Sequence, residues 1–183
     1  MTDKIQNNKQ YFLSIGLLCT LTYLLNHCTA IYQCALVFTV IAITANALTY
    51  FYGKSKTLRG VAFAVLASFV LLWKLPYYID GKIVNGLVFA SLISVMISIY
   101  WSTSVFQKLI AKFSFVISNA LSLVVAAVVD GVVMGLFFAL NNNFSHEKVL
   151  DIFSRELSYK MIYGFVASII VFTIFKTIKM SKS

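Results

Sequence analysis

Long apolar segments alternate with short polar or charged segments along the chain. From Gln10 to Gly53 there is no Lys, Arg, Asp or Glu over 44 residues. This stretch is too long for one membrane helix, because about 20 residues cross a ~30 Å hydrocarbon core. The polar residues 26–29 divide the stretch and predict a turn there. The whole pattern predicts six membrane-spanning helices, at residues 11–26, 29–52, 60–79, 83–106, 113–140 and 157–176.

The composition agrees with this pattern. Hydrophobic residues make up 60% of the 183 residues and charged residues only 11%, whereas about 25% of the residues of a soluble protein are charged. In the third predicted span Gly60, Ala64 and Ser68 recur every four residues, a spacing typical of close helix contacts. We therefore expect an all-α membrane protein in which six helices form a compact bundle, as a single domain over residues 1–183.

The basic residues are distributed unevenly between the two predicted sides of the membrane. Because Lys and Arg are enriched in cytoplasmic loops, the richer side, which holds both termini, is predicted to be cytoplasmic in a multi-pass protein of the cell inner membrane. That side carries ten basic residues: Lys4, Lys9, Lys54, Lys56, Arg59, Lys108, Lys112, Lys176, Lys179 and Lys182. The other side carries five: Lys74, Lys82, Lys148, Arg155 and Lys160. The net charge of +9 is scattered between the spans, which argues against nucleic-acid binding and favours contact with the lipid bilayer.

The fifth predicted span contains one charged residue, Asp130, within the 28-residue apolar run Phe113–Leu140. A carboxylate at bilayer depth costs at least ~2.5–3.5 kcal/mol, so such a residue usually serves a ligand, an ion or a buried partner. Ser118, Ser122 and Asp130 follow one helical stripe, to which Asn119 nearly returns. Hydrogen bonding between helices is the simpler interpretation of this stripe, although it does not require a carboxylate.

The second predicted span offers polar groups that would complement this stripe. Asn46 presents both a donor and an acceptor, and Tyr50, one helical turn later, adds a flat aromatic surface. Together with Asp130 they would suit a planar ligand with N–H edges. The predicted solute-binding residues are Asp130, Asn119, Asn46, Tyr50 and Ser122.

The sequence contains no recognisable signal of enzymatic chemistry. His27 and His146 lie in predicted outer turns without the spacing of a metal site. A glycine-rich phosphate loop and a Walker motif are also missing from the sequence. We therefore predict a protein that is not an enzyme, with no catalytic residues, no metal and no cofactor. Cys28 and Cys34 flank the first predicted turn and would pair only on an oxidising side, which leaves their state open.

Three segments of the chain share features with one family of membrane proteins. They are residues 48–56 (Leu-Thr-Tyr-Phe-Tyr-Gly-Lys-Ser-Lys) followed by Arg59, Asp130-Gly131 followed by Phe137-Phe138, and Tyr159-Lys160 at the start of the last span. In these segments the chain resembles the VUT family of bacterial queuosine-precursor transporters. The family favours Ser and Gln ahead of the aspartate, where this chain has Ala126 and Ala127. The resemblance implies a six-span importer of a 7-deazaguanine such as preQ0, preQ1 or queuine.

Two functional hypotheses follow. The first is an inner-membrane transporter that imports a queuosine precursor or a related nucleobase-like solute, in which Asp130 binds N–H donors or a proton. The second is a non-transport membrane scaffold, or a subunit of a larger transport complex, in which Asp130 pairs with Lys74 or Lys160. Both lysines are expected just inside the outer ends of their spans, where long side chains usually reach the interface. The sequence does not distinguish a homo-oligomer from an assembly with separate energising subunits.

Overall fold

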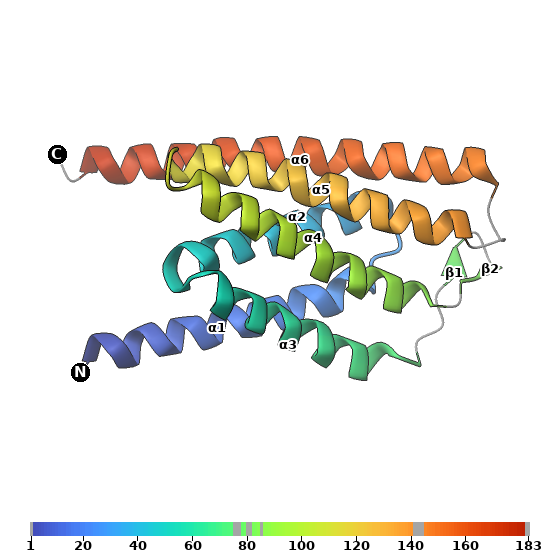
Figure 1. Cartoon of the computed structure of the whole chain (residues 1–183), viewed down its shortest axis with the longest axis horizontal. Coiled ribbons are helices and arrows are strands. Elements are labelled where there is room, and N and C mark those ends of the chain that lie inside the picture. Colours follow the sequence, from blue (N-terminus) through green and yellow to red (C-terminus); the bar gives the residue numbers. More distant parts are fainter. Residues whose placement is uncertain (1, 75–77, 80–81, 85, 141–144, 182–183) are drawn as a thin grey trace.

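The computed structural model describes residues 2–74, 78–79, 82–84, 86–140 and 145–181, with side chains placed for residues 9–74, 84, 86–140, 145–170 and 173. These residues form six helices and a small antiparallel ladder between α3 and α4. The elements are α1 (Thr2–Leu25), α2 (Ile31–Tyr52), α3 (Lys54–Leu72), β1 (Tyr78–Ile79), β2 (Lys82–Ile83), α4 (Leu87–Leu109), α5 (Phe115–Leu140) and α6 (His146–Ser181). All six helices run roughly along one long axis, and α1 begins at the end of the bundle where α6 ends (Figure 1).

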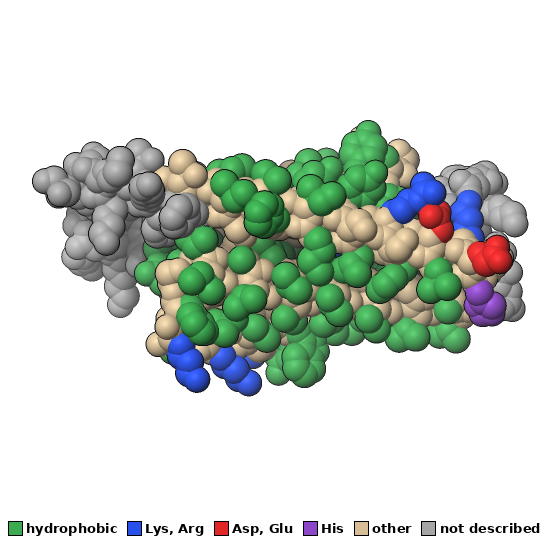
Figure 2. All heavy atoms as spheres, turned by 90° about the horizontal axis from the view of Figure 1, so that it is seen from above, with side chains coloured by type: hydrophobic (Ala, Val, Ile, Leu, Met, Phe, Trp, Pro, Cys, Tyr) green, Lys and Arg blue, Asp and Glu red, His purple; other side chains and the backbone are tan. Residues whose placement is uncertain are grey.

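The outside of the bundle is apolar around its middle. Each of the four helices α2, α3, α4 and α5 is long and apolar enough to cross a membrane, by length and composition. Large hydrophobic side chains are exposed on every helix, among them Leu13, Phe63, Val132 and Phe165. Figure 2 shows apolar side chains over the middle of one face and charged side chains near its ends. This surface is the one expected of a membrane-embedded helical protein, while the number of six spans and the cytoplasmic termini stay predictions.

The helices have bounds that differ from the predicted spans, and α1 begins at Thr2 rather than at residue 11. Helix α6 begins at His146 rather than at residue 157, α3 covers Lys54–Leu72, and α4 begins at Leu87. Residues 75–77 of the predicted third span lie outside the described residues. The predicted bounds stop where the apolar stretch stops, but Lys, Glu, Arg and Leu are good helix formers and continue a helix into polar sequence. The sequence pattern therefore located the helices better than it located their ends.

A single residue, Gly53, connects α2 to α3. Its φ of +83° lies in the left-handed region that favours glycine, and its N–H donates to the carbonyl oxygen of Thr49 at 3.1 Å. The basic segment that follows Gly53 was expected to be a turn. It is instead the first turn of α3, because one glycine is sufficient to reverse the chain.

Helix α2 lies at the centre of the bundle and contacts all five other helices. Helix α1 packs on α2 and α3, and α5 packs between α4 and α6. The close contact predicted from the small residues of α3 is confirmed on the side that faces α1. A Cβ atom at residue 60 would lie 3.2 Å from Cγ1 of Ile15, and Oγ of Ser68 lies 2.8 Å from Oγ1 of Thr22. Asp130, on α5, lies where this helix contacts α4 and α6.

Candidate functional site

Three charged side chains meet inside the bundle and form what we call the triad: Asp130 of α5, and Glu156 and Lys160 of α6. Nζ of Lys160 donates to Oδ2 of Asp130, and also to Oε1 of Glu156 at 2.6 Å. Glu156 and Lys160 lie four residues apart and so share one face of α6. The side chains are 2% exposed for Lys160, 6% for Asp130 and 16% for Glu156. The costly carboxylate in the apolar run therefore has a buried ionic partner.

Neighbouring helices complete the environment of the triad. Oγ of Ser94, on α4, donates to Oδ1 of Asp130 at 2.6 Å. On the α2 side, Nζ of Lys160 lies 4.4 Å from the centroid of the Phe38 ring, within range of a cation–π interaction. Each oxygen of Asp130 thus accepts one hydrogen bond, and the ammonium group is held by two carboxylates and a ring face. The expectation that Lys160 reaches the interface is wrong, because its charge is satisfied inside the bundle.

A close approach of α5 and α6 makes this contact feasible. Gly131, next to Asp130, faces the ring of Phe153, and a Cβ atom at residue 131 would lie only 2.9 Å from Cε2 of that ring. A larger residue at position 131 would force either the Phe153 ring or the two helices to shift. The glycine therefore helps to bring Lys160 within reach of Asp130.

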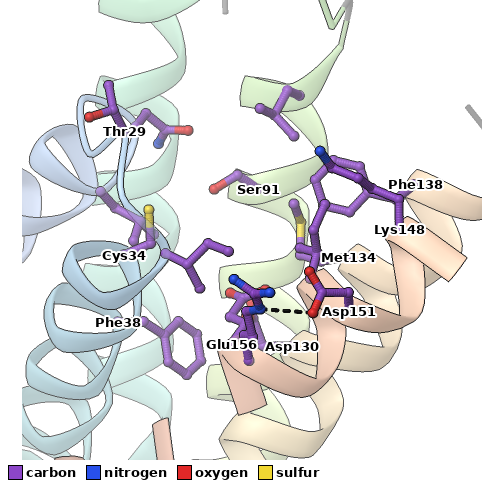
Figure 3. Close-up of a pocket in the computed structure, with 16 residues that line it drawn as sticks. Thr29, Cys34, Phe38, Ser91, Asp130, Met134, Phe138, Lys148, Asp151 and Glu156 are labelled. Carbon is purple, nitrogen blue, oxygen red and sulfur yellow. Dashed lines mark hydrogen bonds and ion pairs between the residues drawn. The ribbon is translucent and has the colours of Figure 1, made fainter. Parts of the chain in front are cut away.

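The triad borders a cavity of about 330 Å³. This volume lies at the lower end of the ~300–1,000 Å³ typical of small-molecule sites. Asp130 and Glu156 line the cavity together with apolar side chains such as Phe38, Met134 and Phe138. In Figure 3 the two carboxylates lie between Phe38 of α2 on one side and Met134 and Phe138 of α5 on the other. The cavity thus combines apolar walls with two convergent carboxylates.

The remaining charged residues of the cavity lie on the first turns of α6. Nε of Arg155 donates to Oδ1 of Asp151 at 2.8 Å, and these side chains are 63% and 48% exposed. Lys148, also exposed, lines the same region. These residues lie at the end of the bundle opposite the start of α1 (Figure 1). The charge of this outer part is solvated, unlike that of the triad.

Three of the predicted site residues form a polar cluster with Ser102, separate from the triad. We call this cluster, which consists of Asn46, Ser102, Asn119 and Ser122, the asparagine–serine seam. Nδ2 of Asn46 donates to Oδ1 of Asn119 at 2.9 Å and to Oγ of Ser122 at 2.8 Å. Oγ of Ser102 donates to the carbonyl oxygen of Ser122 at 3.0 Å. All four residues are 0% exposed, and none of them lines the cavity described above. The seam joins α2, α4 and α5 through neutral hydrogen bonds.

The fifth predicted site residue, Tyr50, lies elsewhere. Its side chain is on the outside of α2, 51% exposed, and its ring centroid lies 5.3 Å from that of Phe115. The structure therefore divides the predicted set into Asp130 at the cavity, Asn46, Asn119 and Ser122 in the seam, and Tyr50 on the surface. Sequence reasoning did not single out Ser94, Phe38 or Glu156. The spacing of Glu156 and Lys160 by four residues was the available signal for the triad.

Cys28 and Cys34 are both present as thiols in this structure. Sγ of Cys34 donates to the carbonyl oxygen of Cys28 at 3.5 Å. Burial raises the pKa of the Cys28 thiol, which lies in the loop between α1 and α2, although a hydrogen bond with Cys34 opposes the shift. Since the thiolate is the reactive form, a raised pKa slows oxidation of Cys28 at neutral pH.

Among the described residues, no group of three His, Cys, Asp or Glu side chains is placed to hold a metal ion. No family model, no curated protein and no solved structure matches the chain. The resemblance to the VUT family therefore stays a prediction, and the functional argument rests on the triad and its cavity.

Proposed function

We propose that the protein is a membrane transporter that binds a small polar solute in the cavity beside the triad. The observation that carries the proposal is the position of Asp130, whose carboxylate lines a cavity of about 330 Å³ instead of being enclosed by apolar side chains. A buried charge that is used only for packing has no need of an adjacent empty volume. Ionisable residues inside membrane helices more often mark a solute or ion pathway.

The proposal includes the orientation inferred from the basic residues. Six helices cross the cell inner membrane, both termini are cytoplasmic, and the cavity then opens toward the outer side. A solute would enter beside the exposed residues Asp151 and Arg155 and reach Asp130 and Glu156 deeper in the bundle. This order, from a solvated rim to buried carboxylates, suits import.

The solute that we propose is a queuosine precursor or a related nucleobase-like molecule, on the strength of the family resemblance. A carboxylate accepts hydrogen bonds from two adjacent N–H groups, such as those on the edge of a 7-deazaguanine. Phe38 and Phe138 offer apolar surface for the ring. Asn46, Asn119 and Ser122 lie apart from this cavity, so their part in solute binding stays a prediction.

The contact between Lys160 and Asp130 favours a second candidate function. A buried ion pair also serves to fix the arrangement of helices, as a scaffold or a subunit of a larger transport complex would require. In that case the triad would stabilise the bundle without any solute. The two candidates differ in whether a ligand stabilises the protein.

A melting experiment on the purified protein separates the two candidates. Purine and 7-deazapurine bases are added to wild type, to Asp130→Asn and to the matched control Glu147→Gln, which removes an exposed acid of α6. We expect at least one base to raise the melting temperature of wild type and of the control but not of Asp130→Asn, because ligand binding stabilises the folded state. If no base has an effect on wild type while Asp130→Asn lowers its melting temperature, the scaffold is the correct interpretation.

Uptake then tests transport itself. A precursor-auxotrophic bacterium that expresses the protein is given labelled 7-deazaguanine base, and accumulation is compared between wild type, Glu147→Gln and Asp130→Asn. We expect accumulation with the first two and little with the third. Normal uptake by Asp130→Asn would remove Asp130 from the mechanism.

A further inference from the structure

The triad carries one negative charge more than it can neutralise. When all three groups are ionised, the carboxylates of Asp130 and Glu156 face the single ammonium group of Lys160. A buried charge without a partner is costly, since little solvent is present to screen it. Some further positive charge is therefore needed near the carboxylates.

None of the described side chains around the triad supplies this charge from a buried position. Helix α2 contributes the Phe38 ring and the Cys34 thiol, and α4 contributes serine hydroxyls, including that of Ser94. On α6, Arg155 is engaged with Asp151 in an exposed pair, and Lys148 is exposed at the rim. The further positive charge must therefore be a proton taken up by a carboxylate or a cationic group that reaches the triad through the cavity.

Glu156 is the group placed to receive it. Each oxygen of Asp130 already accepts one hydrogen bond, Oδ1 from Ser94 and Oδ2 from Lys160. Glu156 uses Oε1 for Lys160, and no described side chain donates to its Oε2. It is also the most exposed member of the triad, at 16%, and it lines the cavity. Oε2 of Glu156 is thus open to a ligand.

We propose that the cavity binds its solute together with one positive charge, which Glu156 accepts. This inference rests on the proposed function and specifies the chemistry of the same site. The charge has two sources: an ammonium group on the solute, or a proton that moves from bulk water onto Oε2 of Glu156 when the solute is neutral. With an ammonium solute the bound complex holds two carboxylates and two cations, and with a proton on Glu156 it holds one carboxylate and one cation, so the net charge is zero in both cases.

Proton counting distinguishes the two sources with a pair of matched solutes. preQ1 carries an aminomethyl group where preQ0 carries a nitrile, and near pH 7 an alkyl amine is already protonated. Binding of each to the purified protein is measured by calorimetry in buffers of different ionisation enthalpy, which gives the number of protons taken up. We expect about one proton more to be taken up with preQ0 than with preQ1. This difference holds whether Glu156 is ionised or protonated before the solute binds.

Variants locate the proton. Glu156→Gln should abolish the difference in proton count and weaken preQ1 more than preQ0, by about tenfold or more in relative affinity. The control Glu147→Gln should keep the wild-type difference. The melting temperature of each variant shows whether it is folded. The difference in proton count between the two bases is measured on wild type, so it tests the inference even if a variant does not fold.

Each outcome decides between the claims. If both bases bind wild type with equal proton counts, the inference is overturned while the proposed binding function stands. If Glu156→Gln keeps the wild-type difference in proton count between the two bases, another group accepts the charge, and the inference is likewise overturned. If neither base binds wild type at any concentration, the proposed function fails, and the inference fails with it.

Discussion

Helix α5 carries two polar regions that are completed in different ways. In the seam, Asn119 and Ser122 are 0% exposed and are joined to Asn46 and Ser102 by neutral hydrogen bonds. At the triad, Asp130 is bound to a cation but also borders a cavity. The two regions lie on the same helical stripe, so the sequence presents them as one feature.

The comparison shows that polarity inside a membrane helix does not by itself mark a ligand site. The neutral groups of the seam meet one another across three helices, and Nδ2 of Asn119, which is left without a partner among the described residues, is buried away from the cavity. Within the described part of the chain, Oγ of Ser118 and Nδ2 of Asn119 are the buried side-chain atoms without a partner. The triad has its side-chain contacts in place but an excess of charge and an adjacent volume. The following variants test whether the two regions differ in energy as they differ in structure.

The largest effect is expected from Lys160→Met. This variant leaves two carboxylates together in the bundle without their cation, and breaking a buried ion pair in this way typically costs about 3–5 kcal/mol. We expect a loss of stability of this order, measured by denaturant unfolding in detergent, with the exposed Lys108→Met as control. Combining Lys160→Met with Asp130→Asn and Glu156→Gln should restore part of the loss. A small effect of Lys160→Met alone would contradict the charged description of the triad.

A pair of serine variants on α4 compares the two regions directly. Ser94 donates to the Asp130 carboxylate and Ser102 to a neutral carbonyl oxygen, and both residues are 0% exposed. Hydrogen bonds to charged groups contribute about 1.5–3 kcal/mol and neutral ones about 0.5–1.5 kcal/mol. We therefore expect Ser94→Ala to destabilise the protein more than Ser102→Ala in the same unfolding measurement. Equal effects would mean that the two regions do not differ in hydrogen-bond energy.

The smallest effect is expected from Arg155→Gln. This side chain is 63% exposed and its partner Asp151 48% exposed, and exposed pairs with this spacing contribute about 0.3–0.5 kcal/mol. The free energy of unfolding should therefore fall by no more than this amount. The difference from wild type should disappear at high salt because exposed charges are screened. A loss close to that of Lys160→Met would show that the rim of the cavity is structural.

The sequence was sufficient for the features that depend on local pattern. A single charge in an apolar run identified Asp130, and the four-residue repeat of small side chains in α3 predicted a close helix contact, which the structure shows to be with α1. The start of α6 was missed because the length of an apolar stretch indicates only the part of a helix that lies in the membrane. Polar residues with good helix propensity extend the helix beyond that part. Asn46 and Tyr50 were expected on one face, but a spacing of four residues leaves a rotation of about 40°. That rotation separates a residue that is 0% exposed from one that is 51% exposed.

The triad itself was only partly predictable. Lys160 was named as one of two partners for Asp130, yet its side chain was expected to point outward. Its true direction depends on which helix packs beside α5, and neither hydropathy nor the local spacing of charges contains this information. The cavity is still less accessible to sequence reasoning, because its walls come from five helices and the loop between α1 and α2.

The contact between Gly131 and Phe153 has a consequence for how the sequence can vary. Between α5 and α6, the ring at position 153 occupies the volume that a side chain at position 131 would need. In evolutionary terms we expect the two positions to covary, with a larger residue at one accompanied by a smaller residue at the other. A relative of this chain would be recognised by that exchange even where its overall sequence has diverged.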